Sequence, residues 1–423
     1  MTIENLLQYL SNIYYNNYKN YVELQILKDS VEKNISLASN NKNNVKELEI
    51  YCQNNSKLIK NTEKNIPHTI LPNGTLLDLK VNPGGGRNKS DDDVYKKFES
   101  LRDQIPRGLT ILKINDDEKD ICIYANKKFF DDDEKIYNNC KIISMEKLNG
   151  DAVHFSCRYL FNKFYLFVGS KTNHIVISQK SDIELYTGEK YAVVRKFAEI
   201  VYDTLAKLSQ RNSEAFLSLL HYTKITAVCE LLQHDYQHIV DIGGNNTDDK
   251  LAFLTFTSTY GNKSFTAFPP DITLKLIDCF EVFDRATYTV VDNKKYHIST
   301  LRDKTNREGQ VLYYVNNFNE TIAMTKVKTI WYRCLRALRE KATFYLNLKK
   351  KKKNSPEDTV IDSINKKYEE MQNWLKLTDF ETTNWKNEAK SFVFWLKENK
   401  QDLQAEELRK SFPNIWDEYL KKS

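Results

Sequence analysis

Hydrophobic residues in the first part of the chain recur at helical spacing. Between residues 3 and 34, apolar side chains follow one another at steps of mostly three or four, from Ile3 through Leu27. This spacing places them on one face of an α-helix, so the segment is predicted to be amphipathic and helical. Residues 35–65 are rich in Asn and Lys, and we expect a loosely ordered, partly helical spacer there.

The middle of the chain changes to short runs of β-branched and aromatic residues. From Leu109 to about Val176 these runs alternate with Asn, Asp, Lys and Gly, which is typical of strands joined by turns. Residues 190–220 have helical periodicity, after which strand-like runs return in the order ITAVCELL, AFLTFTS, VLYYV and ETIAMTKVK. This mixture predicts an α+β domain that is built on antiparallel sheets with helices.

The pattern after Lys328 is helical to the end of the sequence. A run of five lysines, Lys349 to Lys353, is interpreted as an exposed linker. Helices need large apolar anchors to form a core, and four of the five tryptophans lie beyond this run, namely Trp374, Trp385, Trp395 and Trp416. We therefore predict an all-helical C-terminal domain at 355–423, a central α+β domain at 76–345, and an N-terminal helical segment with its spacer at 1–75.

Composition places the chain among ordinary soluble globular proteins, at 41% hydrophobic and 28% charged residues. The net charge of +6 permits a polyanionic partner without requiring one. The seven scattered cysteines contain no C-x-x-C pair, which favours reduced thiols in an intracellular protein. No apolar run is long enough to span a bilayer, and the first residues lack a secretory signal pattern, so we expect no membrane association. The lysine run leaves the cytoplasm and the nucleus both open.

The candidate chemistry centres on Lys147, in the sequence Glu146-Lys147-Leu148-Asn149-Gly150. A lysine amine must lose its proton before it can attack phosphorus, and its reference pKa is about 10.4. Burial and neighbouring cations both lower that pKa. Lys326 and Lys328 are two apart, so they share one face of a strand and can contact one phosphate. We expect these lysines to converge with Lys147 on one triphosphate pocket.

Several further segments follow Lys147 in a telling order. They are Gly169-Ser170-Lys171, Thr226-Ala227-Val228-Cys229-Glu230-Leu231, Arg307-Glu308-Gly309 and Lys326-Val327-Lys328-Thr329-Ile330-Trp331-Tyr332. Upstream lie Pro106-Arg107-Gly108-Leu109 and Lys128-Phe129-Phe130-Asp131. In this order the segments resemble the motifs of covalent nucleotidyltransferases, the superfamily of ATP-dependent ligases and capping enzymes. The likeness is greatest to phage-type RNA ligase 1 proteins and the ligase domain of fungal tRNA ligases, and it covers about residues 95–340.

The resemblance implies a role for each matching residue. Lys147 would form a lysyl-AMP with ATP, and Glu308 would bind a divalent metal, Mg²⁺ or Mn²⁺. The residues expected to contact the nucleotide are Glu146 at the adenine, Asn149 and Gly150 beside the nucleophile, Arg107 and Lys128 at the outer phosphates, Lys171 and Glu230 near the α-phosphate and ribose, and Lys326 and Lys328 at the α-phosphate. Such roles suit phosphoryl transfer, which requires mainly positioning and neutralisation of charge.

Three positions depart from the family pattern. Asn149 stands where Asp is commoner, although tRNA ligases also use Asn there, and it brings no charge. Cys229 stands where phage-type proteins have an aromatic residue, so another aromatic side chain would have to stack on the base. Ala125-Asn126 stands where an arginine is expected, so one substrate contact is absent.

These observations predict an ATP-dependent RNA ligase that joins 5′-phosphate and 3′-hydroxyl ends of RNA, with tRNA among the candidate substrates. We expect the protein to be a monomer. A DNA ligase and a capping guanylyltransferase share the lysyl-nucleotide step, but both usually append an OB-fold of strands, whereas this chain is predicted to append helices. An inactive RNA-binding relative is the remaining alternative. His234 and His238 are four apart and could share a metal on a helix, but no H-E-x-x-H pattern supports such a site.

Overall fold

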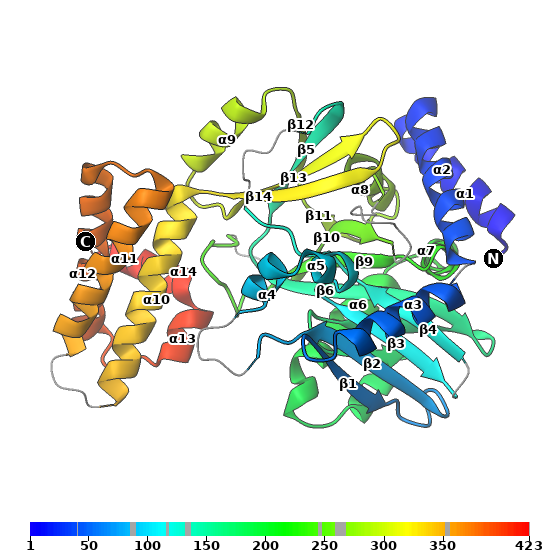
Figure 1. Ribbon diagram of the computed structural model, residues 1–423, viewed down its shortest axis with the longest axis horizontal. Helices are drawn as coiled ribbons and strands as arrows, with labels where there is room; N and C mark the ends of the chain where they lie inside the picture. Colours follow the sequence, from blue (N-terminus) through cyan, green and yellow to red (C-terminus); the bar gives the residue numbers. More distant parts are fainter. Residues whose placement is uncertain are drawn as a thin grey trace.

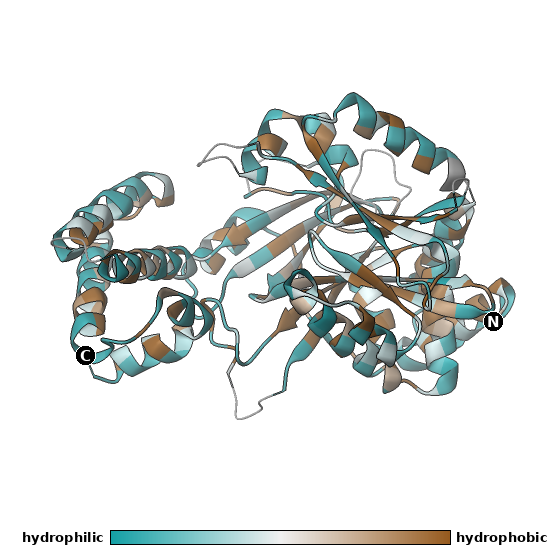
Figure 2. Cartoon of the chain, turned by 90° about the horizontal axis from the view of Figure 1, so that it is seen from below, coloured by the Kyte–Doolittle hydropathy of each residue, from teal (hydrophilic) through white to brown (hydrophobic). Residues whose placement is uncertain are grey.

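The computed structural model describes residues 1–39, 41–84, 90–115, 118–131, 137–243, 248–258, 268–351 and 356–422. These residues form a mixed α/β body with antiparallel sheets and, at one end, a group of C-terminal helices (Figure 1). The helices at the N-terminus lie at the opposite end of the body from the C-terminal group. Figure 2 shows apolar strands in the interior of the body, with polar residues along the outward sides of many helices.

Two of the sheets, one of four strands and one of six, are formed by segments that follow the first three helices in the sequence. The four-stranded sheet has the order β1 (Ile59–Asn65), β2 (Gly74–Val81), β3 (Leu109–Ile114) and β4 (Glu118–Tyr124). The six-stranded sheet has the order β11 (Asp284–Arg285), β10 (Lys250–Thr257), β9 (Thr226–Leu232), β6 (Asp151–Leu160), β7 (Lys163–Gly169) and β8 (His174–Ile177). Neighbouring strands in both sheets are antiparallel, except that β10 and β11 pair in parallel.

The third sheet joins segments that are far apart in the sequence. Its order is β12 (Tyr288–Val291), β5 (Cys140–Lys147), β13 (Gly309–Asn316) and β14 (Thr321–Lys328). Strand β13 pairs with β5 on one side and with β14 on the other, so Gly309 lies opposite both Lys147 and Lys328. This register places the ends of the two lysine-bearing strands side by side across one intervening strand.

Helices cover the sheets and form the C-terminal group. Those in the first 350 residues are α1 (Ile3–Tyr18), α2 (Tyr21–Ala38), α3 (Asn41–Asn54), α4 (Asp91–Lys97), α5 (Glu99–Gln104), the 3₁₀ turns η1 (Lys180–Leu185) and η2 (Glu189–Tyr191), α6 (Ala192–Ala206), α7 (Gln210–Thr223), α8 (Pro270–Asp278), α9 (Lys294–Arg302) and α10 (Ile330–Lys350). The remainder are α11 (Pro356–Leu375), α12 (Asp379–Asn399), α13 (Ala405–Lys410) and α14 (Phe412–Leu420).

The N-terminal region differs from the prediction at two points. The expected helix over 3–34 is two helices, because Lys19 adopts a left-handed conformation (φ 49°) and the Asn20 side chain caps the start of α2. The segment 35–65, expected to be a loosely ordered and partly helical spacer, does contain a helix, α3, but it also contains the edge strand β1, which the sequence did not predict. The boundary predicted between 75 and 76 falls inside β2, and a division there would split the sheet that β1 and β2 share.

The C-terminal helices have their own buried core, which begins earlier in the chain than predicted. Helix α10 supplies Leu335, Leu338 and Tyr345 to this core, together with residues of α11, α12, α13 and α14. The boundary at 345 therefore falls inside α10, which packs with the C-terminal helices along its length. Of the lysine run, Lys349 to Lys351 end α10, and 352–353 lie outside the described residues.

Candidate active site

Lys147 and Lys328 meet at one buried carboxylate. The Nζ atoms of Lys147 and Lys328 lie 2.9 and 2.7 Å from Oε1 of Glu308, whose side chain is only 3% exposed. Glu308 directly precedes β13, the strand between the two lysine-bearing strands. Gly309 makes this approach possible, because it has φ 150° and a Cβ there would lie 1.9 Å from the carbonyl oxygen of Val327.

Buried carboxylates set the protonation of Lys147. Burial alone would lower the pKa of this ammonium, but the charges of Glu308 and Glu230 outweigh burial and raise the pKa above its usual value. The expectation that cations depress the pKa of Lys147 is therefore wrong in this structure. A neighbouring cation does lower the pKa of Lys328. Burial, together with the ammonium of Lys147, lowers this pKa to about 8.

Glu308 remains ionised between the two lysines. Burial would raise the pKa of its carboxyl, but the ammonium groups of Lys147 and Lys328 lower it to about 2. A carboxylate oxygen is a suitable ligand for Mg²⁺ or Mn²⁺, which usually bind one or two protein carboxylates together with substrate phosphates. Among the described residues there is no cluster of three or more metal-ligating side chains. Glu308 therefore fits such a metal only when phosphate oxygens complete the ligand set.

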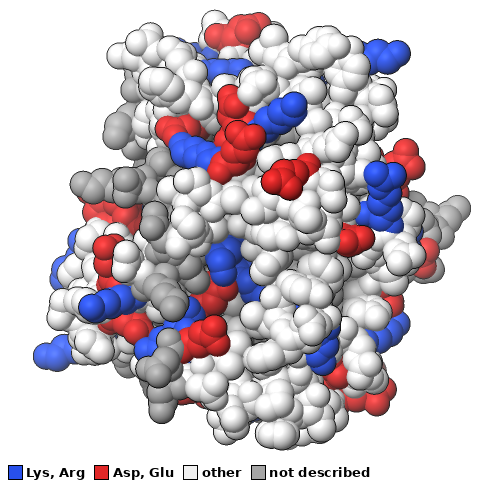
Figure 3. Space-filling model, turned by 90° about the vertical axis from the view of Figure 1, so that its right-hand side faces the viewer, with Lys and Arg blue, Asp and Glu red and all other residues white. Residues whose placement is uncertain are grey.

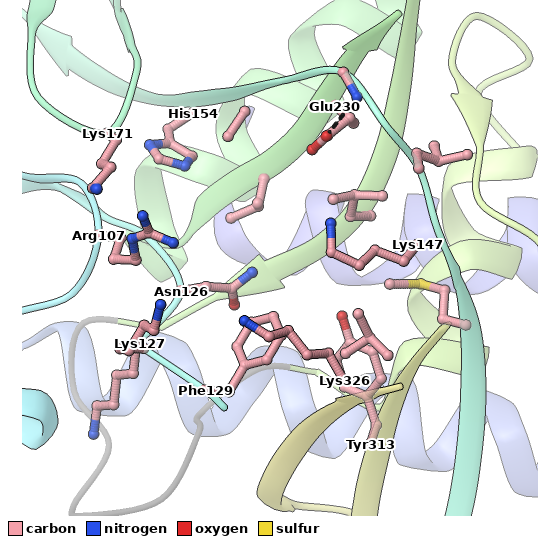
Figure 4. Close-up of a pocket in the computed structure, with 18 of the residues that line it drawn as sticks. Arg107, Asn126, Lys127, Phe129, Lys147, His154, Lys171, Glu230, Tyr313 and Lys326 are labelled. Carbon is pink, nitrogen blue, oxygen red and sulfur yellow. Dashed lines mark hydrogen bonds between the residues drawn. The ribbon is translucent and has the colours of Figure 1, made fainter. Parts of the chain in front are cut away.

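A cavity of about 290 Å³ lies beside Lys147, between the six-stranded sheet and the sheet of β5, β13 and β14. Figure 4 shows Lys147, Lys326 and Arg107 reaching into this space from different parts of the chain. The expected nucleotide-contacting residues that line it are Arg107, Lys128, Glu146, Gly150, Lys171, Glu230 and Lys326. The structure thus brings together side chains from positions 107 to 326 around the candidate nucleophile.

Lys128 and Lys326 converge because their two segments run side by side. The backbone N–H of Lys326 donates to the carbonyl oxygen of Phe130 at 3.0 Å, and Asp131 forms a β-bridge with Lys326. Burial, followed by the charge of Lys128, lowers the pKa of Lys326. The buried Lys128 and the partly buried Lys326 therefore share one end of the cavity, as a polyphosphate site requires.

Gly150 and Glu230 join the loop after Lys147 to strand β9. The backbone N–H of Gly150 donates to Oε1 of Glu230 at 2.9 Å, and burial raises the pKa of this carboxyl. A Cβ on Gly150 would lie 2.2 Å from the carbonyl oxygen of Leu231. In this structure the glycine thus permits close approach to a strand of the protein, in addition to lining the cavity.

Asn149 lies on a different side of Lys147 from most of the expected nucleotide contacts. Its Nδ2 donates to Oε2 of Glu308 at 2.7 Å, and its Oδ1 accepts from the backbone N–H groups of Ile239 and Val240 at 3.0 and 3.2 Å. It lines a second cavity of about 440 Å³, which shares Glu146, Lys147 and Leu148 with the first. In this structure the side chain of Asn149 therefore holds the carboxylate of Glu308 in place.

The phosphate-binding cations expected from the sequence have carboxylate partners on helix α4. Asp91 lies 2.5 Å from Lys171 Nζ and 3.4 Å from Arg107 Nη2, and Asp92 pairs with Lys128. Burial would raise the pKa of Asp91, but Lys171 and Arg107 lower it. No motif in the sequence indicated either aspartate. The Ser90-x-x-Asp93 capping box could have located the start of this helix. The contacts of Asp91 and Asp92 with three distant cations, however, depend on tertiary structure.

Two of the positions that depart from the family pattern, Cys229 and Asn126, lie at or beside the cavity. Cys229 is fully buried and faces the core, while its neighbours Val228 and Glu230 line the cavity. The aromatic side chains that line the cavity among the described residues are Phe129 and Tyr313, with the ring of His154. His154 had no sequence signal, and burial lowers its pKa to about 3, so this ring is neutral. Asn126 lines the cavity at the place where an arginine was expected.

Comparison with protein families identifies one match. A family described as "Domain of unknown function (DUF7920)" matches residues 87–339. The chain belongs to this family. The matched residues include every candidate site residue, from Arg107 to Lys328. No curated protein matches the chain.

Solved structures add distant similarities. Two structures of archaeal ATP-dependent RNA ligase, form 2 and form 1, align with a TM-score of 0.42 each, at 12% and 13% identity. The alignments cover 68% and 75% of this chain and 68% and 71% of those chains. A Naegleria gruberi RNA ligase variant with ATP and Mn aligns with a TM-score of 0.28 at 10% identity, covering 45% of this chain and 49% of that chain.

Other sequence candidates form no comparable site. His238 lies 3.7 Å from Asp151, and His234 lies 4.0 Å from the exposed Asp235, so the two histidines have different partners. They lie in the irregular segment that follows β9, where the spacing of four does not place them on one helix face. None of the helices in the described residues combines the length and apolar character that crossing a membrane requires.

Proposed function

We propose that this protein is an ATP-dependent RNA ligase that works through a lysyl-AMP intermediate. The observation that supports this most directly is the position of Lys147 in the wall of a cation-rich cavity, with Lys326 beside it and Lys328 on the same carboxylate, Glu308. The order of the motifs that supply these residues is the order found in phage-type RNA ligase 1 proteins. The cavity would hold ATP, with its phosphates toward Arg107, Lys128 and Lys171.

The proposed reaction has three steps. After losing its proton, Nζ of Lys147 attacks the α-phosphorus of ATP, and pyrophosphate leaves. The AMP then passes from Lys147 to the 5′-phosphate of an RNA end. The 3′-hydroxyl of a second end attacks that activated phosphate, forms the phosphodiester bond and releases AMP. Mg²⁺ or Mn²⁺ bound at Glu308 would neutralise charge on the phosphates. Lys326 and Lys328 supply the fixed positive charge that favours the transition state at the α-phosphate.

Two features favour RNA ligation over the related reactions. The described residues after β14 form helices, whereas DNA ligases and capping enzymes usually append an OB-fold of strands. The resemblance in the segment from Lys326 to Tyr332 is to RNA ligase 1 proteins. Labelling of the protein with ATP but not GTP, followed by joining of 5′-phosphorylated RNA but not DNA, would distinguish ligation of RNA from both alternatives.

The test of the nucleophile replaces Lys147 by arginine. A guanidinium keeps the positive charge but cannot lose its proton to become a nucleophile. We expect Lys147→Arg to transfer no labelled AMP from ATP to the protein. Lys141→Arg, on the same strand and paired with Asp271 at the surface, is the matched control and should label normally. Normal labelling of Lys147→Arg would show that another residue is the nucleophile.

A further inference from the structure

We propose that helix α9 and the loop that follows it bind the single-stranded RNA whose end reaches Lys147. The surface consists of Lys295, Tyr296, Arg302, Lys304 and Arg307, and we call it the α9 strip. This inference rests on the proposed function, because it names where the nucleic-acid substrate of that reaction lies. Neither the resemblance nor the family match assigns a role to α9, which lies between the segment of Glu230 and the segment of Glu308 in the sequence.

The α9 strip carries a local excess of positive charge. Residues 294–307 contain five cations, Lys294, Lys295, Arg302, Lys304 and Arg307, and a single carboxylate, that of Asp303. The net charge of these 14 residues is therefore +4, whereas the whole chain of 423 residues carries only +6. Positive charge concentrated on one exposed element is the electrostatic feature by which proteins bind a nucleic-acid backbone.

The cations of the α9 strip also lack acidic partners among the described residues. Lys295, Arg302, Lys304 and Arg307 are exposed, and none of them forms an ion pair with a carboxylate of the described residues. Elsewhere many surface lysines and arginines have acidic partners, as in Lys180 with Asp203 or Lys386 with Glu369. Figure 3 shows basic and acidic side chains intermixed on the face of the molecule away from the C-terminal helices. The free cations of the strip are thus available to phosphates.

The packing of α9 explains why these side chains face outward. Leu301 and Ile298 anchor the helix on β13 and β14, where they pack against Leu312 and Val327. Lys295, Ser299 and Arg302 follow one another at steps of four and three, so they share one exposed face, which flanks the face of Ile298 and Leu301. Figure 1 shows α9 between the sheet of β12, β5, β13 and β14 and the C-terminal helices. The strip therefore lies on the side of the body toward the C-terminal helices.

The second cavity connects the strip to the nucleophile. Thr305, Asn306 and Arg307, at the end of the strip, line this cavity together with Glu146 and Lys147. A strand that follows the cations from Lys295 to Arg307 is thereby led to Lys147 on a side that the larger group of nucleotide contacts does not occupy. Such an arrangement lets an RNA end approach the lysine while the first cavity holds the nucleotide.

Tyr296 adds a feature that distinguishes a nucleic acid from other polyanions. Tyr296 is 72% exposed, at the beginning of α9 and next to Lys295. An exposed aromatic ring among unpaired cations is the usual combination in proteins that bind single strands, because bases stack on the ring while phosphates contact the cations. A double-stranded helix or an acidic peptide would not use such a ring in this way.

The test measures binding of a fluorescent, 5′-phosphorylated single-stranded RNA by anisotropy at several salt concentrations. The triple variant Lys295→Ala, Arg302→Ala and Lys304→Ala removes three cations, and each phosphate contact on a single strand contributes about 0.7 to the slope of log K against log salt. We expect the slope to become shallower by about 2 and the affinity to fall at least tenfold. The control variant, Lys57→Ala, Lys60→Ala and Lys207→Ala, removes three exposed cations elsewhere and should bind like the wild type.

Tyr296→Ala is the second variant and tests stacking separately. We expect RNA affinity to fall about tenfold, as for the loss of one stacked base, with the salt slope unchanged. Phe318→Ala removes the ring of a similarly exposed residue, 83% accessible, from the turn at the other end of β13, and should have no effect. A cooperative thermal unfolding transition is the criterion that each variant is folded.

The outcomes separate this inference from the proposed function. Unchanged RNA affinity and salt slope in the triple variant would overturn the α9 strip, even if the wild type forms lysyl-AMP and joins RNA. Equal losses in the triple variant and its control would also overturn it, since they would indicate only a general effect of net charge. Failure of the wild type to label with ATP would instead refute the proposed ligase, whatever the RNA-binding result.

Discussion

At the scale of single residues, Asn149 does what the more usual aspartate of this motif could not do in the present surroundings. Its oxygen accepts from two backbone N–H groups, and its Nδ2 donates to the carboxylate of Glu308. An aspartate would keep the accepting oxygens, but it would place a second negative charge against Glu308 in a buried site. The neutral amide therefore avoids electrostatic repulsion with the negative charge of Glu308.

Asn149→Asp should consequently impair the first step. We expect the rate of lysyl-AMP formation to fall at least tenfold, because the hydrogen bond to Glu308 is replaced by repulsion between like charges, a change of about 1.4 kcal/mol or more. Asn138→Asp, an exposed position just before β5, makes the same chemical change as a control. Single-turnover labelling with ATP measures both, and equal rates for the two variants would contradict this account of Asn149.

Single residues also show what a sequence can and cannot reveal about a site. Lys147, Lys326 and Glu308 were recognisable because each lies in a short motif whose order is informative. The protonation state of Lys147 could not be predicted from the sequence, because it depends on Glu308 and Glu230. These two residues are distant in sequence and approach Lys147 only through strand pairing. His154 lies in no motif, and only its position in the folded sheet brings it to the cavity.

At the scale of elements, helix α4 lies against the cations that are expected to bind the outer phosphates. Asp91 and Asp92 neutralise part of the charge of Arg107, Lys128 and Lys171. Carboxylate oxygens thereby take hydrogen-bonding positions that phosphate oxygens would otherwise use. A triphosphate must compete with these ion pairs for the same donors, so α4 is expected to weaken the binding of ATP.

Asp91→Asn tests this competition. We expect the Kd of α,β-methylene ATP, which cannot donate AMP, to fall by about threefold to tenfold, because the carboxylate that contacts two of the cations loses its charge. Asp93→Asn removes the same charge from the same turn of α4, where the side chain only caps the helix, and should change the Kd little. Calorimetric titration measures both, and weaker binding by Asp91→Asn would mean that Asp91 positions the cations instead of competing for them.

The elements differ in how far the sequence predicted them. The strands from Leu109 to Ile177 are runs of β-branched and aromatic residues, many of them buried one after another, and the sequence located these strands well. Edge strand β1 was missed because nearly all its side chains are exposed and polar, so it carries no alternating pattern. The break between α1 and α2 was missed because the hydrophobic spacing continues across Lys19, where only the backbone conformation changes.

At the scale of the whole molecule, the C-terminal helices and the candidate active site share one short segment. Ile239 is buried in the core of the C-terminal helices, and its backbone N–H donates to Asn149. Arg339 of α10 donates to the carbonyl oxygen of His238, and Gln237 donates to that of Lys410. The segment 237–240 therefore depends on the C-terminal helices for its position, and Asn149 depends on this segment.

Ile239→Ala should affect both stability and chemistry. We expect it to lower the free energy of unfolding by about 2–5 kcal/mol, as for other buried isoleucines, and to slow lysyl-AMP formation under conditions where the protein is folded. Ile415→Ala, in the same core but far along the chain in α14, should cost similar stability with normal labelling. Chemical denaturation and single-turnover labelling compare the two, and normal labelling by Ile239→Ala would separate the C-terminal helices from the site.

The long-range arrangement is what the sequence predicted least. The helical character of the C-terminal region was evident from its periodicity and its tryptophans. The order β12-β5-β13-β14, however, joins strands more than 130 residues apart, and no local pattern specifies which strands pair. The same holds for α10, whose packing with the C-terminal helices could not be read from its own sequence.

The distribution of tryptophan in this fold gives the protein an optical property. Residues 1–330 contain none, whereas Trp331 begins α10 and the other four lie in the C-terminal helices, with Trp395 and Trp416 in their core. Intrinsic tryptophan emission excited at long wavelength therefore originates from one end of the molecule alone. A fluorescence-detected melt follows that end, while circular dichroism follows the whole chain, so coincident curves would mean that the two ends unfold as one unit.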